Sequence, residues 1–74
     1  MTVSKFIGTE NIDINSILYV YNKAYTGNIN DIYYYIFKLI LINNKKVWKF
    51  VQATTRQNIV VDIDNKTNIT ADTF

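Results

Sequence analysis

The residues best suited to chemistry form a short run in which lysines and aromatic rings alternate. This candidate nucleic-acid-binding set comprises Lys45, Lys46, Trp48, Lys49 and Phe50, supported by Arg56. Cationic side chains contact phosphates and flat rings stack on bases, which is how proteins bind single-stranded nucleic acid. On a strand, however, Trp48 and Phe50 share one face with Lys46, whereas Lys49 points the other way. The alternative interpretation is that both rings belong to the core and the lysines form a solvated hairpin tip. We favour this alternative because the net charge is only +2.

A second candidate surface is aromatic. The predicted protein-interface residues are Tyr19, Tyr21, Tyr25, Tyr33, Tyr35 and Phe37. Tyrosine supplies rigid contact area and a hydroxyl that tolerates water, so it is enriched in binding surfaces. The competing interpretation makes these rings cross-strand partners within a sheet. Six Tyr, four Phe and one Trp exceed what one small core can hide, which predicts an aromatic face that is exposed unless it is paired.

Catalytic and metal chemistry has little support in the residue types present. The chain contains no His and no Cys, so the commonest general base, thiolate nucleophiles and sulfur ligands are all missing. Ser4 and Ser16 therefore have no histidine to activate them. Asp62 and Asp64 share one side of a predicted strand and turn, but Thr67 stands where a calcium loop needs Gly. We predict no enzyme activity, no metal and no cofactor.

Composition and length predict one small globular domain spanning residues 1–74. The longest apolar run, 32–42, is about half the ~20 residues that a membrane-spanning helix needs, and Lys38 interrupts it. No signal peptide is recognisable, so we expect a cytoplasmic protein without a membrane partner. The abundance of Asn, Ile, Lys, Tyr and Phe is typical of A/T-rich genomes. This composition indicates a low-GC bacterium or one of its phages, in which case the location is the host cytoplasm.

The run 32–42 also predicts the central strand of a sheet, because alternate side chains of a strand point to opposite faces and here both are apolar. Such a strand normally lies between two layers of protein. A 74-residue chain supplies two covering layers with difficulty, so a second copy or a target is expected to cover one face. The sequence does not decide which face that is, because a shift of one residue exchanges them.

The remaining elements predict an all-β protein, a small antiparallel meander of four or five strands that forms a curled sheet or an SH3-like barrel. Strands are predicted at 2–7, 17–26, 32–42, 47–54 and 59–63, with a brief further strand in the tail 68–74. Polar hairpins are predicted around 27–31, 43–46 and 55–58. The alternative is an α+β fold with one helix within 11–24, since Ile14, Ile17, Leu18 and Tyr21 have helical spacing.

These patterns favour a non-enzymatic protein-interaction module, a small phage-encoded or low-GC bacterial protein. We expect it to self-associate as a homodimer and to bind and occlude a host macromolecular surface, acting as an inhibitor. The alternative function is single-stranded nucleic-acid binding by the hairpin 45–56. No motif in the sequence identifies a family.

Overall fold

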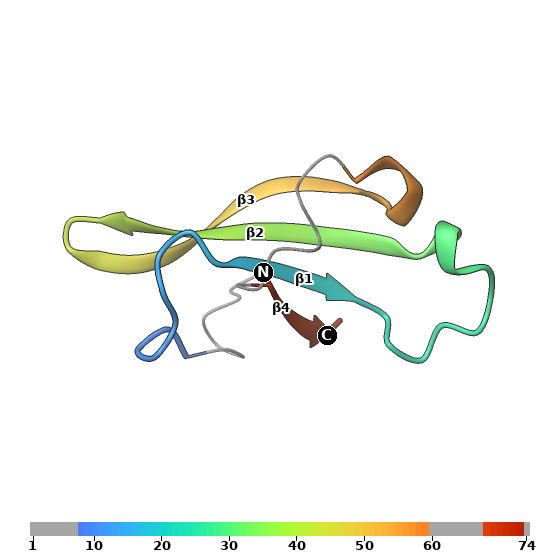
Figure 1. The fold of residues 1–74 in the computed structure, drawn as a ribbon, viewed down its shortest axis with the longest axis horizontal. Coiled ribbons are helices and arrows are strands. Elements are labelled where there is room, and N and C mark those ends of the chain that lie inside the picture. The colour runs from blue at the N-terminus through green and yellow to red at the C-terminus, as the bar shows by residue number, and fades with distance from the viewer. Residues whose placement is uncertain (1–7, 60–67, 74) are drawn as a thin grey trace.

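The computed structural model describes residues 8–59 and 68–73, and within them the fold is all-β. The strands are β1 (Ile17–Tyr21), β2 (Tyr33–Ile42), β3 (Lys45–Thr55) and β4 (Asn68–Asp72), and the 3-10 turns are η2 (Ile29–Asp31) and η3 (Arg56–Asn58). The strands form one sheet in the order β3-β2-β1-β4, shown in Figure 1. This sheet is curled and open rather than a closed barrel, because β3 and β4 lie at opposite edges. The predicted fold class is therefore confirmed, in its curled-sheet form.

The strand connections agree with a meander over the first three strands only. β1, β2 and β3 pair antiparallel in chain order, as predicted. β4 instead lies beside β1 and runs parallel to it, with Leu18 opposite Ile69. The expectation of a purely antiparallel meander is wrong at this strand. The predicted strands 2–7 and 59–63 lie outside the described residues, apart from Ile59, which is not in a strand.

The segment 11–24 holds β1 and no helix, so the α+β alternative is wrong. Asn15 has a positive φ of 74°, which interrupts a right-handed helix at its centre. Ser16 Oγ donates to the carbonyl of Asp13 at 2.6 Å and closes a tight turn there. From Ser16 to Val20 every residue is buried. A strand between two layers buries consecutive residues in this way, whereas an amphipathic helix buries a stripe.

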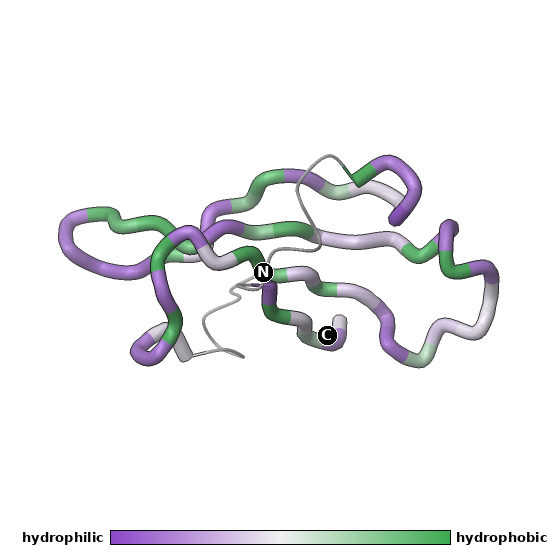
Figure 2. Tube along the Cα trace, viewed as in Figure 1, coloured by the Kyte–Doolittle hydropathy of each residue, from purple (hydrophilic) through white to green (hydrophobic). Residues whose placement is uncertain are grey.

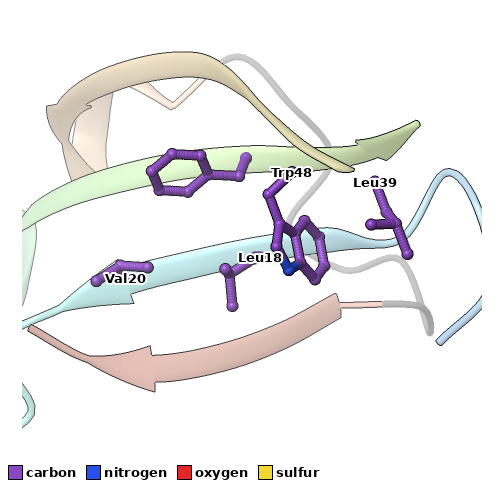
Figure 3. Close-up of a cluster of buried hydrophobic side chains, with 5 residues drawn as sticks. Leu18, Val20, Leu39 and Trp48 are labelled. Carbon is purple, nitrogen blue, oxygen red and sulfur yellow. The ribbon is translucent and has the colours of Figure 1, made fainter. Parts of the chain in front are cut away.

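Both faces of the sheet carry a small apolar cluster. The first, here called the Trp48 face, comprises Leu18, Val20, Phe37, Leu39 and Trp48. The second, the Tyr34 face, comprises Ile17, Tyr19, Tyr34 and Ile36. Figure 3 shows the Trp48 indole between Leu18 and Leu39 over the sheet. The two-sided apolar pattern of the central strand thus corresponds to two clusters, and β2 contributes to both.

The β2–β3 hairpin is longer than the rest of the sheet. Its turn is Asn43–Asn44, whose φ angles of 51° and 64° are those that Asn tolerates best after Gly. β1 pairs with β2 only from Tyr35 to Lys38, and backbone hydrogen bonds from Asn15 and to Ser16 end at Leu39. Residues 40–47, here called the arm, pair only with each other among the described residues. Figure 1 shows the arm reaching past β1, and Figure 2 shows apolar residues continuing along it up to a polar turn.

A β-bulge sets which residues of β3 share a face. Ile36 is opposite Gln52 and Phe37 is opposite Phe50, so Val51 is the extra residue. Without this extra residue, Trp48, Phe50, Gln52 and Thr54 would line one face. The register set by the Asn43–Asn44 turn places the two rings on the Trp48 face, and the bulge moves Gln52 to the Tyr34 face, opposite Ile36.

Leu39 and Leu41 provide a matched test of where the core ends. Both lie on the Trp48 face of β2, but Leu39 is fully buried and Leu41 is 52% exposed on the arm. We expect Leu39→Ala to lower the free energy of unfolding by about 2–5 kcal/mol through lost burial and a cavity. Leu41→Ala should change it by less than about 0.5 kcal/mol. Urea denaturation at one protein concentration measures both, and equal losses would contradict a core that ends at Leu39.

Candidate interaction surfaces

The charges are segregated along the chain in a way that concentrates cations on the β2–β3 hairpin. Five of the eight cationic residues lie between Lys38 and Arg56, whereas no Asp or Glu occurs between Asp31 and Asp62. The modest net charge of +2 therefore conceals a hairpin that carries only positive charge. Both candidate surfaces predicted from the sequence draw on this hairpin, so the orientation of each side chain decides what either surface can bind.

Lys46 is held by the protein itself. Its Nζ donates to the carbonyl of Ile12 at 2.7 Å and lies 3.4 Å from the carbonyls of Thr9 and Glu10. These contacts fasten the segment before β1 against the Trp48 face of the arm, where Ile12 packs on the core. A lysine that satisfies backbone carbonyls is not free to contact an external anion without giving up those bonds.

Trp48, the ring predicted to stack on bases, is only 9% exposed. It packs within the Trp48-face cluster, opposite Leu39 on the neighbouring strand. Within the described residues its Nε1 is buried without a hydrogen-bond partner. Phe50, by contrast, is 53% exposed and contacts Phe37 edge to face, with ring centroids 5.7 Å apart. Of the two rings in the predicted nucleic-acid set, the structure exposes Phe50 and not Trp48.

The lysines on the other side of the hairpin form a strip along the Tyr34 face. Lys38 and Lys49 are directly opposite each other on β2 and β3, and both are exposed. Further along the arm, Ile40 faces Val47, and Ile42 faces the exposed Lys45. This lysine strip is defined as Lys38, Lys45 and Lys49 with Ile40, Ile42 and Val47 between them. No described acidic residue forms an ion pair with its lysines.

The remaining member of the predicted set, Arg56, lies at the opposite end of β3. It follows Thr55 in η3, and its Nη1 donates to the hydroxyl of Tyr34 at 3.4 Å. Eleven residue steps separate it from Lys45, which on a strand is roughly 35 Å. The structure therefore does not bring Arg56 together with the lysines of the arm.

The predicted aromatic interface is divided between the two faces and a loop. Tyr33, Tyr35 and Phe37 lie along the Trp48 face of β2, and Phe50 stands opposite Phe37. These four residues are here called the aromatic strip. Tyr33 contacts Tyr35 with ring centroids 5.3 Å apart in a T-shaped arrangement. Tyr33 is 49% exposed, Tyr35 is half-buried and Phe37 is buried, so the strip has one edge in the core and one in solvent.

The other predicted interface tyrosines serve the fold. Tyr19 is buried and meets Tyr34 edge to face at 5.9 Å, and Tyr21 stacks on Tyr34 at 4.6 Å. Both lie on the Tyr34 face, opposite the aromatic strip. Tyr25 lies in the loop after β1, where its ring occupies the space that a Cβ at Gly27 would need. Gly27 is therefore required by a close approach rather than by its backbone angle.

The sequence did not predict one residue of the aromatic strip and one residue of the lysine strip to lie there. Phe50 is a member of the predicted nucleic-acid-binding set, but it completes the aromatic strip because the register that starts at the Asn43–Asn44 turn places it opposite Phe37. In the sequence Lys38 only interrupts an apolar run, whereas in the structure it faces Lys49 across the hairpin. Strand alternation combined with the Asn43–Asn44 turn would have paired these two lysines from the sequence alone.

The chain matches no protein-family model, no curated protein and no solved structure at a significant level. Within the described residues no helix is both long and apolar enough to cross a membrane. No group of three acidic, histidine or cysteine side chains in that part of the chain is placed to hold a metal ion. Asp62 and Asp64, considered above for a cation, lie outside it.

The cross-strand lysine pair predicts an unusual response to charge reversal. Like charges directly opposite each other destabilise a sheet, whereas opposite charges contribute roughly 0.2–1 kcal/mol. We expect Lys49→Glu to raise the free energy of unfolding by about 0.5–1 kcal/mol at low salt, and high salt to reduce the gain. Lys45→Glu is the matched control, because Lys45 faces Ile42 and gains no cation partner. Chemical denaturation measures both, and an equal effect of the two reversals would contradict repulsion between Lys38 and Lys49.

Proposed function

We propose that this chain is a non-enzymatic protein-interaction module that self-associates through the aromatic strip. The observation that carries this proposal is that one face of the β2–β3 hairpin combines exposed rings with a single charged side chain, Lys46, which is bonded within the chain. The odd-numbered residues of β2 from Tyr33 to Leu41 are all uncharged. Opposite them stand Thr55, Ala53, Phe50, Trp48 and the internally bonded Lys46.

A second copy of the chain suits this surface because the strip can meet its own copy without bringing like charges together. The opposite face of the same hairpin suits self-pairing less well, since a symmetric contact would bring Lys38, Lys45 and Lys49 of both copies into one interface. Aromatic side chains are enriched and charged ones depleted in the centre of protein interfaces. Tyr33 and Phe50 are each about half exposed, so burial against a partner would remove substantial apolar area from water.

A target protein is the alternative partner for the aromatic strip. The test below distinguishes it from a second copy of the chain. The absence of His and Cys supports the non-enzymatic part, because the commonest general base and nucleophilic thiol are both missing. The proposal includes a cytoplasmic location. The short apolar run of β2, interrupted by Lys38, supports it.

Self-association can be tested by sedimentation equilibrium of the full chain and of three variants. We expect Tyr33→Ser and Phe50→Ser each to weaken dimerisation by about tenfold or more, which corresponds to about 1.4 kcal/mol. Ile42→Ser is the matched control. It removes an apolar side chain that is 49% exposed, similar to Tyr33 at 49%, but it lies on the opposite face.

The control should dimerise like the unchanged protein. A chain that remains monomeric at about 1 mM would overturn self-association, since a dissociation constant above that value corresponds to less than about 4 kcal/mol. Dimers that are weakened only by Ile42→Ser would place the interface on the lysine strip instead.

A further inference from the structure

We propose that the lysine strip of the β2–β3 hairpin contacts the phosphate backbone of double-stranded nucleic acid. This inference is independent of the aromatic strip, which lies on the opposite face. It also differs from base stacking by Trp48, because it uses the other face of the hairpin and needs no ring.

The first argument is charge complementarity. Lys38, Lys45 and Lys49 are exposed on one face and none of them forms an ion pair with a described acidic residue. No Asp or Glu occurs anywhere from residue 32 to residue 61, so a negatively charged surface approaching the hairpin meets no repelling side chain within it. Neutralising phosphates with lysine releases counterions, and this drives sequence-independent binding to nucleic acid.

The second argument is the cost of the lysine pair to the fold. Lys38 and Lys49 stand directly opposite each other, an arrangement that destabilises a two-stranded sheet. A local feature that opposes folding without a compensating contact is expected at a functional site. An anion placed between the two ammonium groups would relieve their repulsion, so bound phosphate supplies the missing contact.

The third argument concerns the shape and chemistry of the strip, which favour a duplex over a single strand or an acidic protein. A two-stranded ribbon fits the major groove of a B-form DNA duplex, and the arm is such a ribbon. The exposed side chains between the lysines are Ile42 and Val47, with Ile40 half-buried, and none of these can stack on bases. Lys49 and Lys45 are four residues apart, roughly 13 Å on a strand. Phosphates recur along both strands of a duplex, so flexible lysines at this spacing find partners in any register, whereas acidic side chains on a protein would need a matching position.

The experiment is a titration of a fluorescently labelled duplex of about 20 base pairs with the full chain, followed by anisotropy from about 50 to 200 mM salt. Three phosphate contacts predict a slope of log K against log salt of about −2.7. Each of Lys38→Gln, Lys45→Gln and Lys49→Gln should reduce the size of that slope by about 0.9. Lys23→Gln is the matched control, because Lys23 is exposed, carries the same charge and follows β1 outside the hairpin.

Four results would overturn the proposal. The first is an absence of binding at about 50 mM salt, where non-specific complexes are strongest. The second is an equal loss of slope for Lys23→Gln, which would indicate net charge rather than the strip. The third is tighter binding to a single strand of the same length, which would favour the 45–56 stacking interpretation. The fourth is equal affinity for polyglutamate, which would make an acidic protein the partner. Circular dichroism of each Gln variant checks that it is folded.

Discussion

The rest of the structure depends on one constraint: β2 is apolar on both sides, and the described part of the chain provides no helix to cover either one. Ile36 and Leu39 are fully buried, yet they point to opposite faces of the same strand. The sheet must therefore support two small clusters instead of one large core. Burial is concentrated where β1 flanks β2: the Trp48-face cluster takes residues from β1, β2 and β3, and the Tyr34-face cluster takes residues from β1 and β2. Beyond that region the same apolar pattern continues into solvent.

The exposed surfaces follow from the different lengths of the strands. β1 and β4 each have five residues, whereas β2 has ten and β3 has eleven. The excess length of the hairpin extends past β1 at the arm, where Leu41, Ile42 and Val47 are exposed. At the opposite end it leaves Tyr33 half exposed. Within residues 8–59 and 68–73 the apolar pattern exceeds the sheet that buries it, and this excess supports the proposed binding role.

The sequence contained enough information to predict the hairpin but not the sheet edge. The continuous apolar residues of β2, the Asn43–Asn44 turn and the returning strand are local signals, and the observed β2 and β3 agree with them. The parallel pairing of β4 with β1 has no local signal, because it joins residues about fifty positions apart. The helical spacing around Ile17 was a coincidence of a segment that is apolar on both faces. Five consecutive buried residues fit a strand, and the positive φ of Asn15 excludes the helix.

The candidate site was harder to predict than the fold because it depends on burial, hydrogen bonding and strand register, which the spacing of residues in the sequence does not determine. Alternation correctly grouped Trp48, Phe50 and Lys46, but burial separates Trp48 from Phe50 and backbone carbonyls hold Lys46. The bulge at Val51 then fixes which part of β3 lies beside the tyrosines. Because the sequence alone does not give the pairing of the strands, Tyr19 and Tyr33 are equivalent interface candidates in it. In the sheet they lie on opposite faces, and Tyr19 is 3% exposed whereas Tyr33 is 49% exposed.

The two proposed surfaces are compatible because the hairpin separates them by the thickness of one sheet. Alternation places the uncharged rings on the Trp48 face and Lys38, Lys45 and Lys49 on the Tyr34 face. A dimer that buries the aromatic strip would therefore leave both lysine strips exposed, one on each copy. Joining two weak phosphate-binding surfaces in one particle raises their combined affinity for a long polyanion without any new contact, provided that both can reach it. Self-association through one face would in this way strengthen binding through the other.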